Sequence, residues 1–314
     1  MKKNLSIILL LTAFLAVGRV SLAQSLTSIT AVPHRQEIKV DPGEVSSGHI
    51  LKAVNNGSSE LSVQVKIQDF IVVDNEGTPA PVEADESGRW AASSWIQVSP
   101  SQFTLKPGEE KQLDMVIITS EDALPGGHYA VVFYEPMGNF GVDGSGAAVA
   151  PNVGTLLYIT VNGAINENAT VRRMDIASFS EYGPVKIDTE IANMSDVHIN
   201  PVGEIKIYNM LGGLDQTLKL ESLNIFPGTS REFENSWNKI WGFGKYKAML
   251  EAGYGSQGNT LQAVVYFWVL PWKIIAFTVL TIVIVIMLII LIKKNNRIPP
   301  AQVPPVKNDL LSED

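Results

Sequence analysis

The 314-residue chain contains no cysteine. This absence excludes disulfide bonds, thiolate catalysis, zinc held by cysteine and c-type haem attachment. Disulfides persist mainly in proteins that work outside the cytosol. If this chain is exported, core packing alone must therefore hold its domains together.

Histidine and catalytic motifs are also scarce. The four histidines, His34, His49, His128 and His198, are far apart, and none lies in a His-Glu-x-x-His frame. The chain has no Gly-x-Ser-x-Gly elbow, no Gly-Lys-Ser or Gly-Lys-Thr phosphate loop, and no Gly-x-Gly-x-x-Gly opening a helix. We therefore predict no catalytic residue, no cofactor, no metal and no enzymatic activity. His128 follows a turn and opens a strand, so a structural role is predicted for it.

Basic residues are outnumbered between the two ends of the chain. Residues 24–271 carry 16 Lys and Arg against 29 Asp and Glu, a net charge of −13. Nucleic acids and anionic lipid headgroups both need a basic surface on their partner. This segment is therefore expected to be a soluble, self-repelling domain region with no nucleic acid partner.

The two long apolar runs lie at the ends of the chain. Lys2 and Lys3 precede an apolar run over residues 5–17, and Ser21-Leu22-Ala23 supplies small residues for a signal peptidase. We predict a signal peptide over residues 1–23 and a mature chain beginning at Gln24. The alternative is an N-terminal membrane anchor, and in either case the middle of the chain is exported.

The second apolar run predicts a membrane span. Nineteen uncharged residues begin at Ile274 and end at Ile292, and a helix of that length is roughly 28 Å long, enough to cross the hydrocarbon core. Trp268 and Trp272 precede it, one helical turn apart if the helix starts early, where aromatic rings favour the headgroup layer. We predict a transmembrane helix over residues 271–292. Because Lys293, Lys294 and Arg297 follow it, the positive-inside rule predicts a cytoplasmic tail over residues 293–314 and a single-pass type I protein of the cell membrane.

Period-two alternation dominates the exported part. Leu61, Val63, Val65 and Ile67 alternate with polar residues, which is the pattern of a strand with one face on a core. Turn signals such as Asp41-Pro42-Gly43 recur at short spacing, and no long amphipathic helix is evident. The predicted fold class is all-β, with two tandem Ig-like antiparallel β-sandwiches over residues 24–165 and 166–270, followed by one transmembrane α-helix.

A weak internal repeat supports two sandwiches. The paired segments, in matching order, are Ala53-Val54-Asn55-Asn56-Gly57-Ser58 with Ile191-Ala192-Asn193-Met194-Ser195, Phe103-Thr104-Leu105-Lys106-Pro107-Gly108 with Leu223-Asn224-Ile225-Phe226-Pro227-Gly228, and Gly127-His128-Tyr129-Ala130 with Gly244-Lys245-Tyr246-Lys247-Ala248. The first copy is longer by 18 residues between its first two segments. We interpret the extra length as an insertion between Val73 and Ser94, predicted to be a solvated loop.

That insertion is the candidate ligand-binding loop, because loops on rigid sandwiches are where recognition concentrates. Its candidate site residues are Asp74, Glu76, Glu83, Asp85, Glu86 and Trp90. Asp74-Asn75-Glu76-Gly77 could also suggest calcium, but a hairpin turn is the simpler interpretation because the later bidentate glutamate is missing. Among the other tryptophans, Trp95, Trp237 and Trp241 are predicted core residues.

The motifs of the first sandwich resemble those of a known family. They are Val40-Asp41-Pro42-Gly43-Glu44, Asn55-Asn56-Gly57-Ser58, Gln68-Asp69-Phe70, Asp74-Asn75-Glu76-Gly77, Ser94-Trp95-Ile96, Leu105-Lys106-Pro107-Gly108-Glu109, Pro125-Gly126-Gly127-His128-Tyr129 and Val153-Gly154-Thr155-Leu156-Leu157. Together they resemble the N-terminal domain of the WxL-interacting proteins, bacterial surface proteins of Gram-positive-type envelopes. The resemblance implies peptidoglycan binding by the first domain and binding of other surface proteins, WxL proteins among them, by the second.

We therefore expect a non-enzymatic, membrane-anchored cell-surface protein that engages cell-wall peptidoglycan, other surface proteins, or both. The alternative is a membrane-tethered chaperone-like or assembly module that lends a strand to exported proteins. A lesser alternative is an envelope hydrolase.

Overall fold

The computed structural model describes residues 28–82, 88–137 and 153–295. The predicted signal peptide, the glycine-rich stretch that begins at Gly138 and the predicted cytoplasmic tail beyond Asn295 lie outside these residues. Within them the fold is all-β with one C-terminal helix, as the alternation and the turn spacing predicted.

The first sandwich packs two sheets face to face. One sheet has the order β1-β3-β8-β6, and the other has the order β2-β10-β9-β4-β5, with β7 also paired to β4. The strand bounds are β1 (Ile29–Val32), β2 (Arg35–Val40), β3 (Val45–Asn55), β4 (Leu61–Val72), β5 (Pro79–Val82), β6 (Ile96–Ser99), β7 (Gln102–Leu105), β8 (Glu110–Ile118), β9 (Gly126–Pro136) and β10 (Gly154–Val161).

Alternating side chains fill the space between these sheets. Leu61 and Val63 of the predicted strand are buried, and Val65 and Ile67 pack against the core from partly buried positions. The largest fully buried members of this core are Leu51, Leu105, Leu113, Met115, Ile117, Tyr134, Leu157 and Ile159. Since no disulfide is possible, this contiguous apolar cluster supplies the main stabilisation of the sandwich.

At two places in the first sandwich the chain crosses from one sheet to the other. β1 lies in the first sheet, and after Val32-Pro33 the chain continues as β2 in the other. β6 and β7 are related in the same way across Ser99-Pro100. β2 runs alongside β10 in the same direction, so these two strands form a parallel pair at the edge of an otherwise antiparallel sheet.

The second sandwich repeats the plan. A three-stranded sheet, β11-β13-β16, faces a five-stranded sheet, β12-β18-β17-β14-β15, in which β12 is again parallel to its neighbour β18. The bounds are β11 (Ala169–Ile176), β12 (Phe179–Ser180), β13 (Val185–Asn193), β14 (Val202–Tyr208), β15 (Leu214–Lys219), β16 (Ser230–Trp237), β17 (Gly244–Tyr254) and β18 (Asn259–Val269). Trp237 is fully buried, with its ring 4.7 Å from that of Tyr246 and 5.6 Å from that of Phe267.

The one long helix among the described residues, α2 (Trp272–Asn295), follows β18 after two residues. By length and composition it can cross a membrane, and its side chains make no buried core with the sandwiches. The helix does not start early: Trp268 belongs to strand β18, and only Trp272 lies on the helix. At the other end the helix continues three residues past the predicted limit, to Asn295.

The described part of the predicted solvated loop between Val73 and Ser94 contains regular structure. Part of it forms β5, which pairs with β4, and two short 3-10 helices follow, η1 (Gly88–Trp90) and η2 (Ser93–Trp95). The buried carboxylate of Asp69 on β4 accepts hydrogen bonds from the backbone N–H groups of Ala92 (2.8 Å) and Ser93 (2.7 Å). Charge and proline content predicted solvation, but this buried carboxylate attaches the far end of the segment to the sheet.

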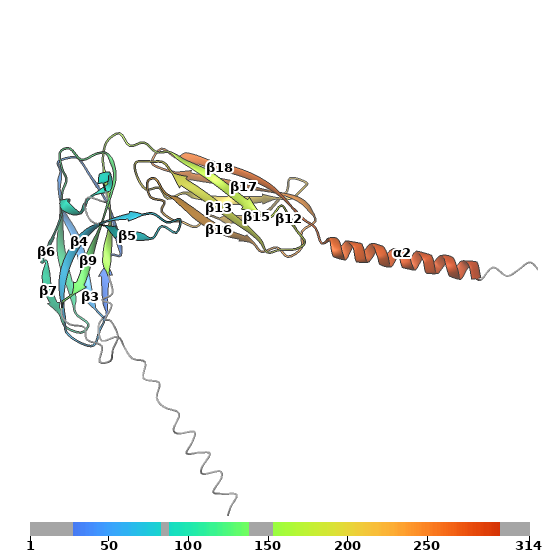
Figure 1. Ribbon diagram of the computed structural model, residues 1–314, viewed down its shortest axis with the longest axis horizontal. Helices are drawn as coiled ribbons and strands as arrows, with labels where there is room; N and C mark the ends of the chain where they lie inside the picture. The colour runs from blue at the N-terminus through green and yellow to red at the C-terminus, as the bar shows by residue number, and fades with distance from the viewer. Residues whose placement is uncertain (1–27, 83–87, 138–152, 296–314) are drawn as a thin grey trace, which may run out of the picture.

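Figure 1 shows how these parts are arranged. The two sandwiches meet at an angle, and the β4–β5 hairpin extends from the first sandwich towards strand β16 of the second. Helix α2 leaves the second sandwich at the end opposite the first. The junction between the sandwiches is therefore held well away from the membrane helix.

Candidate functional site

Aromatic side chains fill the junction between the two sandwiches. Phe70 on β4, Tyr129 on β9 and Tyr158 on β10 point out of the first sandwich, and Phe226 reaches them from a turn of the second. Phe226 lies edge-on to Tyr129 at a centroid distance of 4.9 Å and to Tyr158 at 5.3 Å. These rings are all buried, so the junction behaves as a small third core.

One hydroxyl connects the sandwiches across this cluster. The Tyr129 hydroxyl accepts a hydrogen bond from the backbone N–H of His198 (2.8 Å) and lies 3.3 Å from His198 Nδ1. Burial lowers the pKa of His198 to about 4, and burial raises the pKa of the Tyr129 hydroxyl. At neutral pH the histidine is therefore neutral, and an unprotonated Nδ1 can accept a hydrogen bond from the tyrosine O–H.

A second connection is polar and centres on Asp196. Its carbonyl oxygen accepts from the N–H of Gly127 (2.7 Å), and its carboxylate pairs with Arg89 (3.0 Å) and accepts from the N–H of Asn166 (3.2 Å). Gly126 has φ 121°, and a Cβ at this position would overlap the Asp196 carbonyl oxygen. Glycine is therefore required here both for the backbone conformation and for the close approach of the two domains.

The third connection is the tip of the β4–β5 hairpin. The Asn75 carbonyl oxygen accepts from the N–H of Glu232 on β16 (3.2 Å), and the Asn75 amide oxygen lies 3.2 Å from the Ser230 hydroxyl oxygen. Gly77 lies directly against the guanidinium of Arg231, where a Cβ would overlap it. The insertion of the first sandwich thus docks on the edge strand of the second.

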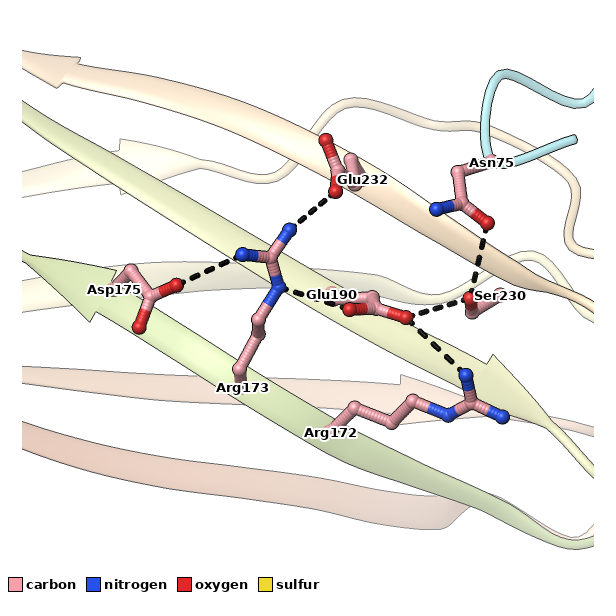
Figure 2. A network of polar contacts seen from close by, with 7 residues as sticks. All are labelled: Asn75, Arg172, Arg173, Asp175, Glu190, Ser230 and Glu232. Carbon is pink, nitrogen blue, oxygen red and sulfur yellow. Dashed lines mark hydrogen bonds and ion pairs between the residues drawn. The ribbon is translucent and has the colours of Figure 1, made fainter.

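Figure 2 shows the polar network that this tip joins. Glu190 on β13 accepts from Ser230 (2.7 Å) and pairs with both Arg172 (3.4 Å) and Arg173 (2.9 Å). Arg173 also pairs with Asp175 and Glu232. Two consecutive arginines reach one carboxylate because a β-bulge between Val171 and Arg173 breaks the alternation of β11. Ser230 and the two arginines lower the pKa of Glu190.

A cleft of about 610 Å³ lies between the hairpin, η1 and the second sandwich. Its buried floor is apolar, and its walls carry two guanidinium groups, one amide and the hydroxyl residues Thr229 and Ser230. The lining side chains that matter below are Phe70, Tyr129 and Phe226 on the floor and Asn75, Arg89, Trp90 and Arg172 on the walls. This cleft is the candidate functional site.

The predicted site residues are only partly gathered here. Trp90 lines the cleft, half-buried, with the Arg89 guanidinium 4.4 Å above its ring. Asp74 does not line it: its carboxylate accepts from the N–H groups of Glu76 and Thr78, and the hydrogen bonds with Thr78 lower its pKa. Glu76 is exposed beside it, while Glu83, Asp85 and Glu86 lie outside the described residues.

The predictions of structural and core residues were also only partly right. Trp95 packs against the first core with its ring 4.5 Å from that of His128, and His128 is buried with its ring nitrogens near two carbonyl oxygens, so both structural roles are confirmed. Trp237 is a core residue, but Trp241 is 48% exposed, so its prediction was wrong. Among the described residues, no group of three or more His, Asp or Glu could hold a metal ion.

Sequence reasoning missed Phe226, Arg172 and His198. The repeat held a signal for Phe226, because its aligned partner in the first sandwich is Lys106, an exposed turn residue. Lysine suits an exposed turn position, so a phenylalanine at the equivalent position indicates that another part of the protein covers it. No comparable signal marked Arg172, because the bulge that turns it towards the cleft is a feature of strand pairing.

The described residues form a two-sandwich protein with an interdomain cleft, followed by one helix of membrane-spanning length. Comparison with solved structures finds similar folds among fimbrial chaperones. The class 5 fimbriae chaperone CfaA aligns at 12% identity and a TM-score of 0.39, over 76% of this chain and 99% of that chain. The E. coli chaperone DraB aligns at 15% identity and a TM-score of 0.35, over 77% and 95%.

A chain of the Salmonella enterica complex of the SafA pilin with the SafB chaperone aligns at 13% identity and a TM-score of 0.37, over 77% of this chain and 99% of that chain. Likeness at this level concerns the class of fold alone. No family model and no curated protein matches the sequence. The resemblance to WxL-interacting proteins therefore stays a prediction.

Proposed function

We propose that this chain is a non-enzymatic, membrane-anchored assembly module that holds an extended segment of another exported protein in its interdomain cleft. The observation that carries the proposal is the cleft itself, with an apolar floor and a few convergent polar groups from the hairpin turn, η1 and β11. Such a combination is typical of ligand sites. Its location at the junction of two domains, far from α2, leaves it open to a partner outside the membrane.

The geometry favours a peptide over a sugar. Sugar stacking needs an exposed ring face, but the floor rings of Phe70, Tyr129 and Phe226 are buried and packed against one another. The exposed side of Trp90 is shared with the Arg89 guanidinium. An apolar floor beside Arg89 and Arg172 instead suits an apolar side chain with a carboxylate or carbonyl next to it.

Strand β16 supports an extended conformation for the bound segment. It is the edge of its sheet, and the Glu232 N–H already takes a main-chain partner, the Asn75 carbonyl. Because backbone groups of alternate residues face the same side in an antiparallel ladder, Glu234 and Ser236 present theirs along the same edge. Peptides that add a strand to an exposed edge are held by these main-chain bonds.

The edge strand β5 suits this role less well, because it is four residues long and carries Pro79 and Pro81, which lack N–H donors. The wall polymer expected from the family resemblance remains a competing ligand, and it is included in the experiment below.

The test measures binding by the full-length chain in nanodiscs. Fluorescent extended peptides from a peptide array are titrated in parallel with soluble peptidoglycan fragments. We expect peptide binding, weakened about 10-fold by Arg172→Gln, because a hydrogen bond to a charged group contributes about 1.5 to 3 kcal/mol. Arg173→Gln is the matched control, since its guanidinium is in the same network but does not line the cleft. Binding of wall fragments alone, or equal losses in both variants, would refute the cleft as a peptide site.

A further inference from the structure

The exposed apolar side chains of the second sandwich gather at one end. Strand pairing places four connecting segments there: residues 179–184, 209–214, 238–243 and 268–272. Their exposed large hydrophobic side chains are Phe179, Tyr182, Met210, Leu211, Leu214, Ile240, Trp241, Phe243, Trp268 and Trp272, each between 48% and 89% exposed. At the opposite end, beside the first sandwich, the corresponding residues are Met194 and Val202.

This apolar end is the one from which helix α2 leaves. β18 runs into the helix after Val269, and Gly244 at the start of β17 pairs with Val269, so the loop over residues 238–243 lies beside the helix start. A soluble domain rarely exposes this much contiguous apolar surface without a partner. The position of the surface, continuous with a helix of membrane-spanning length, indicates which partner covers it.

The loop and the helix share a groove. Trp241 and Phe243 line an apolar groove of about 320 Å³ together with Pro271, Ile274, Ile275, Thr278 and Val279. At about 1.5 Å per residue, Val279 lies roughly 10 Å along the helix from Trp272. A loop of the sandwich that contacts this part of the helix is therefore at the depth of the upper bilayer when the helix spans it.

We propose that this end of the second sandwich is a lipid-binding surface that seats in the headgroup layer of the bilayer, with an acyl chain in the groove between Trp241, Phe243 and α2. Amphipathic tryptophan and tyrosine rings favour that layer, and Leu211 and Ile240 add apolar area. Lys245 and Lys247, whose ammonium groups lie 4.5 Å from Tyr266 and 4.8 Å from Tyr208, flank the surface at phosphate height.

The consequence of this seating is a fixed orientation of the second sandwich relative to the membrane. β17 and β18 are eleven residues long, so the second sandwich extends roughly 35 Å from its seated end. A sandwich attached by the helix alone would pivot about Leu270 and Pro271. A seated sandwich instead holds the interdomain cleft at a set height above the membrane.

The absence of cysteine makes the test direct, because a single introduced cysteine is the only site a thiol-reactive spin label can modify. Full-length chains with Trp241→Cys, Phe243→Cys or Leu211→Cys are labelled in phosphatidylcholine nanodiscs, with Met194→Cys as the exposed control at the far end. We expect the label at the three seated positions to be severalfold more accessible to oxygen than to a water-soluble nickel chelate, and the reverse at position 194.

Two results would overturn the proposal. Water-like accessibility at position 241 in a chain with wild-type circular dichroism would show that the surface stands clear of the bilayer. Shielding from both reagents, with dipolar broadening between labels, would show that a second copy covers the surface. Quenching of the native tryptophans by shallow spin-labelled lipids in the unsubstituted chain gives a readout that no cysteine substitution can disturb.

Discussion

Asn55 and Asn193 hold equivalent positions in the two sandwiches and make the same hydrogen bonds. The Asn55 amide donates to the carbonyls of Ser59 (2.8 Å) and Leu105 (3.1 Å), and the Asn193 amide donates to those of Val197 (2.9 Å) and Ile225 (2.8 Å). Each side-chain oxygen accepts from the N–H two residues ahead, at Gly57 and Ser195.

The backbone of both asparagines is held in the same way. The Asn55 N–H donates to the Glu109 carbonyl, and the Asn55 carbonyl accepts from Gly108. Asn193 is bonded likewise to Thr229 and Gly228. In both copies, the Pro-Gly turn that ends the second repeat segment is thus hydrogen-bonded to the asparagine of the first segment. The weak sequence repeat therefore reflects a shared structural device that fixes a strand end to a distant turn.

We expect Asn193→Ala and Asn55→Ala each to lower the free energy of unfolding by about 2 to 3 kcal/mol. Both side chains are buried, and removal of one leaves two carbonyls and one N–H without their partner. Asn56→Ala is the control, because the Asn56 side chain is exposed and bonds only to Thr30 among the contacts described. Chemical denaturation of the three variants checks this, and equal effects of all three would contradict it.

We expect Asp69→Ala to destabilise the first sandwich by about 3 kcal/mol and to release the segment that precedes Trp95. The buried carboxylate holds Ala92 and Ser93, and its loss leaves one buried and one partly buried N–H group without this acceptor. Hydrogen exchange at Ala92 and Ser93 and denaturation midpoints measure the effect. Asp74→Ala is the control, because the Asp74 carboxylate accepts hydrogen bonds only within its own exposed turn. This variant should leave the hydrogen exchange rates and the denaturation midpoint nearly unchanged.

We expect Phe226→Ala to uncouple the sandwiches without unfolding either one. The ring packs on Phe70, Tyr129 and Tyr158 of the first sandwich, and such a truncation removes about 3 to 5 kcal/mol of packing energy in a core. Spin labels on cysteines introduced at Glu60 and Glu221 should show a broader distance distribution. An unchanged distribution would mean that the hairpin tip and the Arg89–Asp196 pair alone set the domain angle.

We expect the domain junction to weaken as pH falls from about 6.5 towards 4. The folded pKa of His198 is about 4, below its ordinary value of 6.5, so the unfolded or separated state binds more protons. The contribution of His198 to the free energy of unfolding is fully present above pH 6.5 and is lost as the pH falls towards 4. At 1.36 kcal/mol per pKa unit, the loss is up to about 3 kcal/mol. His198→Gln should remove part of this slope in denaturation measured between pH 4 and 7.

His128 supplies part of any remaining slope, because burial lowers its pKa as well. His49→Gln is the control for the His198 variant, since His49 bonds to Ser46 at a distance from the junction. A slope unchanged in His198→Gln but absent in His128→Gln would place the acid sensitivity in the first sandwich core.

We expect chelator and reductant to leave the thermal unfolding temperature unchanged. The chain has no cysteine, and the Asp74 carboxylate is engaged by the N–H groups of its own turn. Differential scanning fluorimetry with and without chelator and with added calcium checks this. A clear loss of stability in chelator would establish a cation site at the hairpin tip.

The sequence alone determined the fold class, because a two-residue period can be read from neighbouring residues and requires no knowledge of distant contacts. It also determined the membrane-length helix and the Asn55–Asn193 repeat. The sequence also showed that Phe226 replaces Lys106 at the aligned position of the second repeat, but it did not show that Phe226 packs against the first sandwich.

Strand pairing decided what the sequence could not. Gly126 and Gly244 both have positive φ and both pair with the last residue of a neighbouring strand, Val161 and Val269. The sequence alignment of Gly127 with Gly244 was therefore wrong by one residue. In a strand one residue reverses the face, so Tyr246 points into its core, whereas Tyr129 points outward to Phe226.

The candidate site depended on the same kind of information. Trp90, Asn75, Arg172 and Phe226 come from three separate parts of the chain, and a bulge, a buried carboxylate and the angle between two sandwiches bring them together. Local periodicity reports whether a residue faces a core, because that depends on its neighbours. Which surfaces meet depends on contacts between distant residues, such as Tyr129 with His198, 69 positions apart, and Asn75 with Ser230, 155 positions apart, and only the tertiary structure decides those.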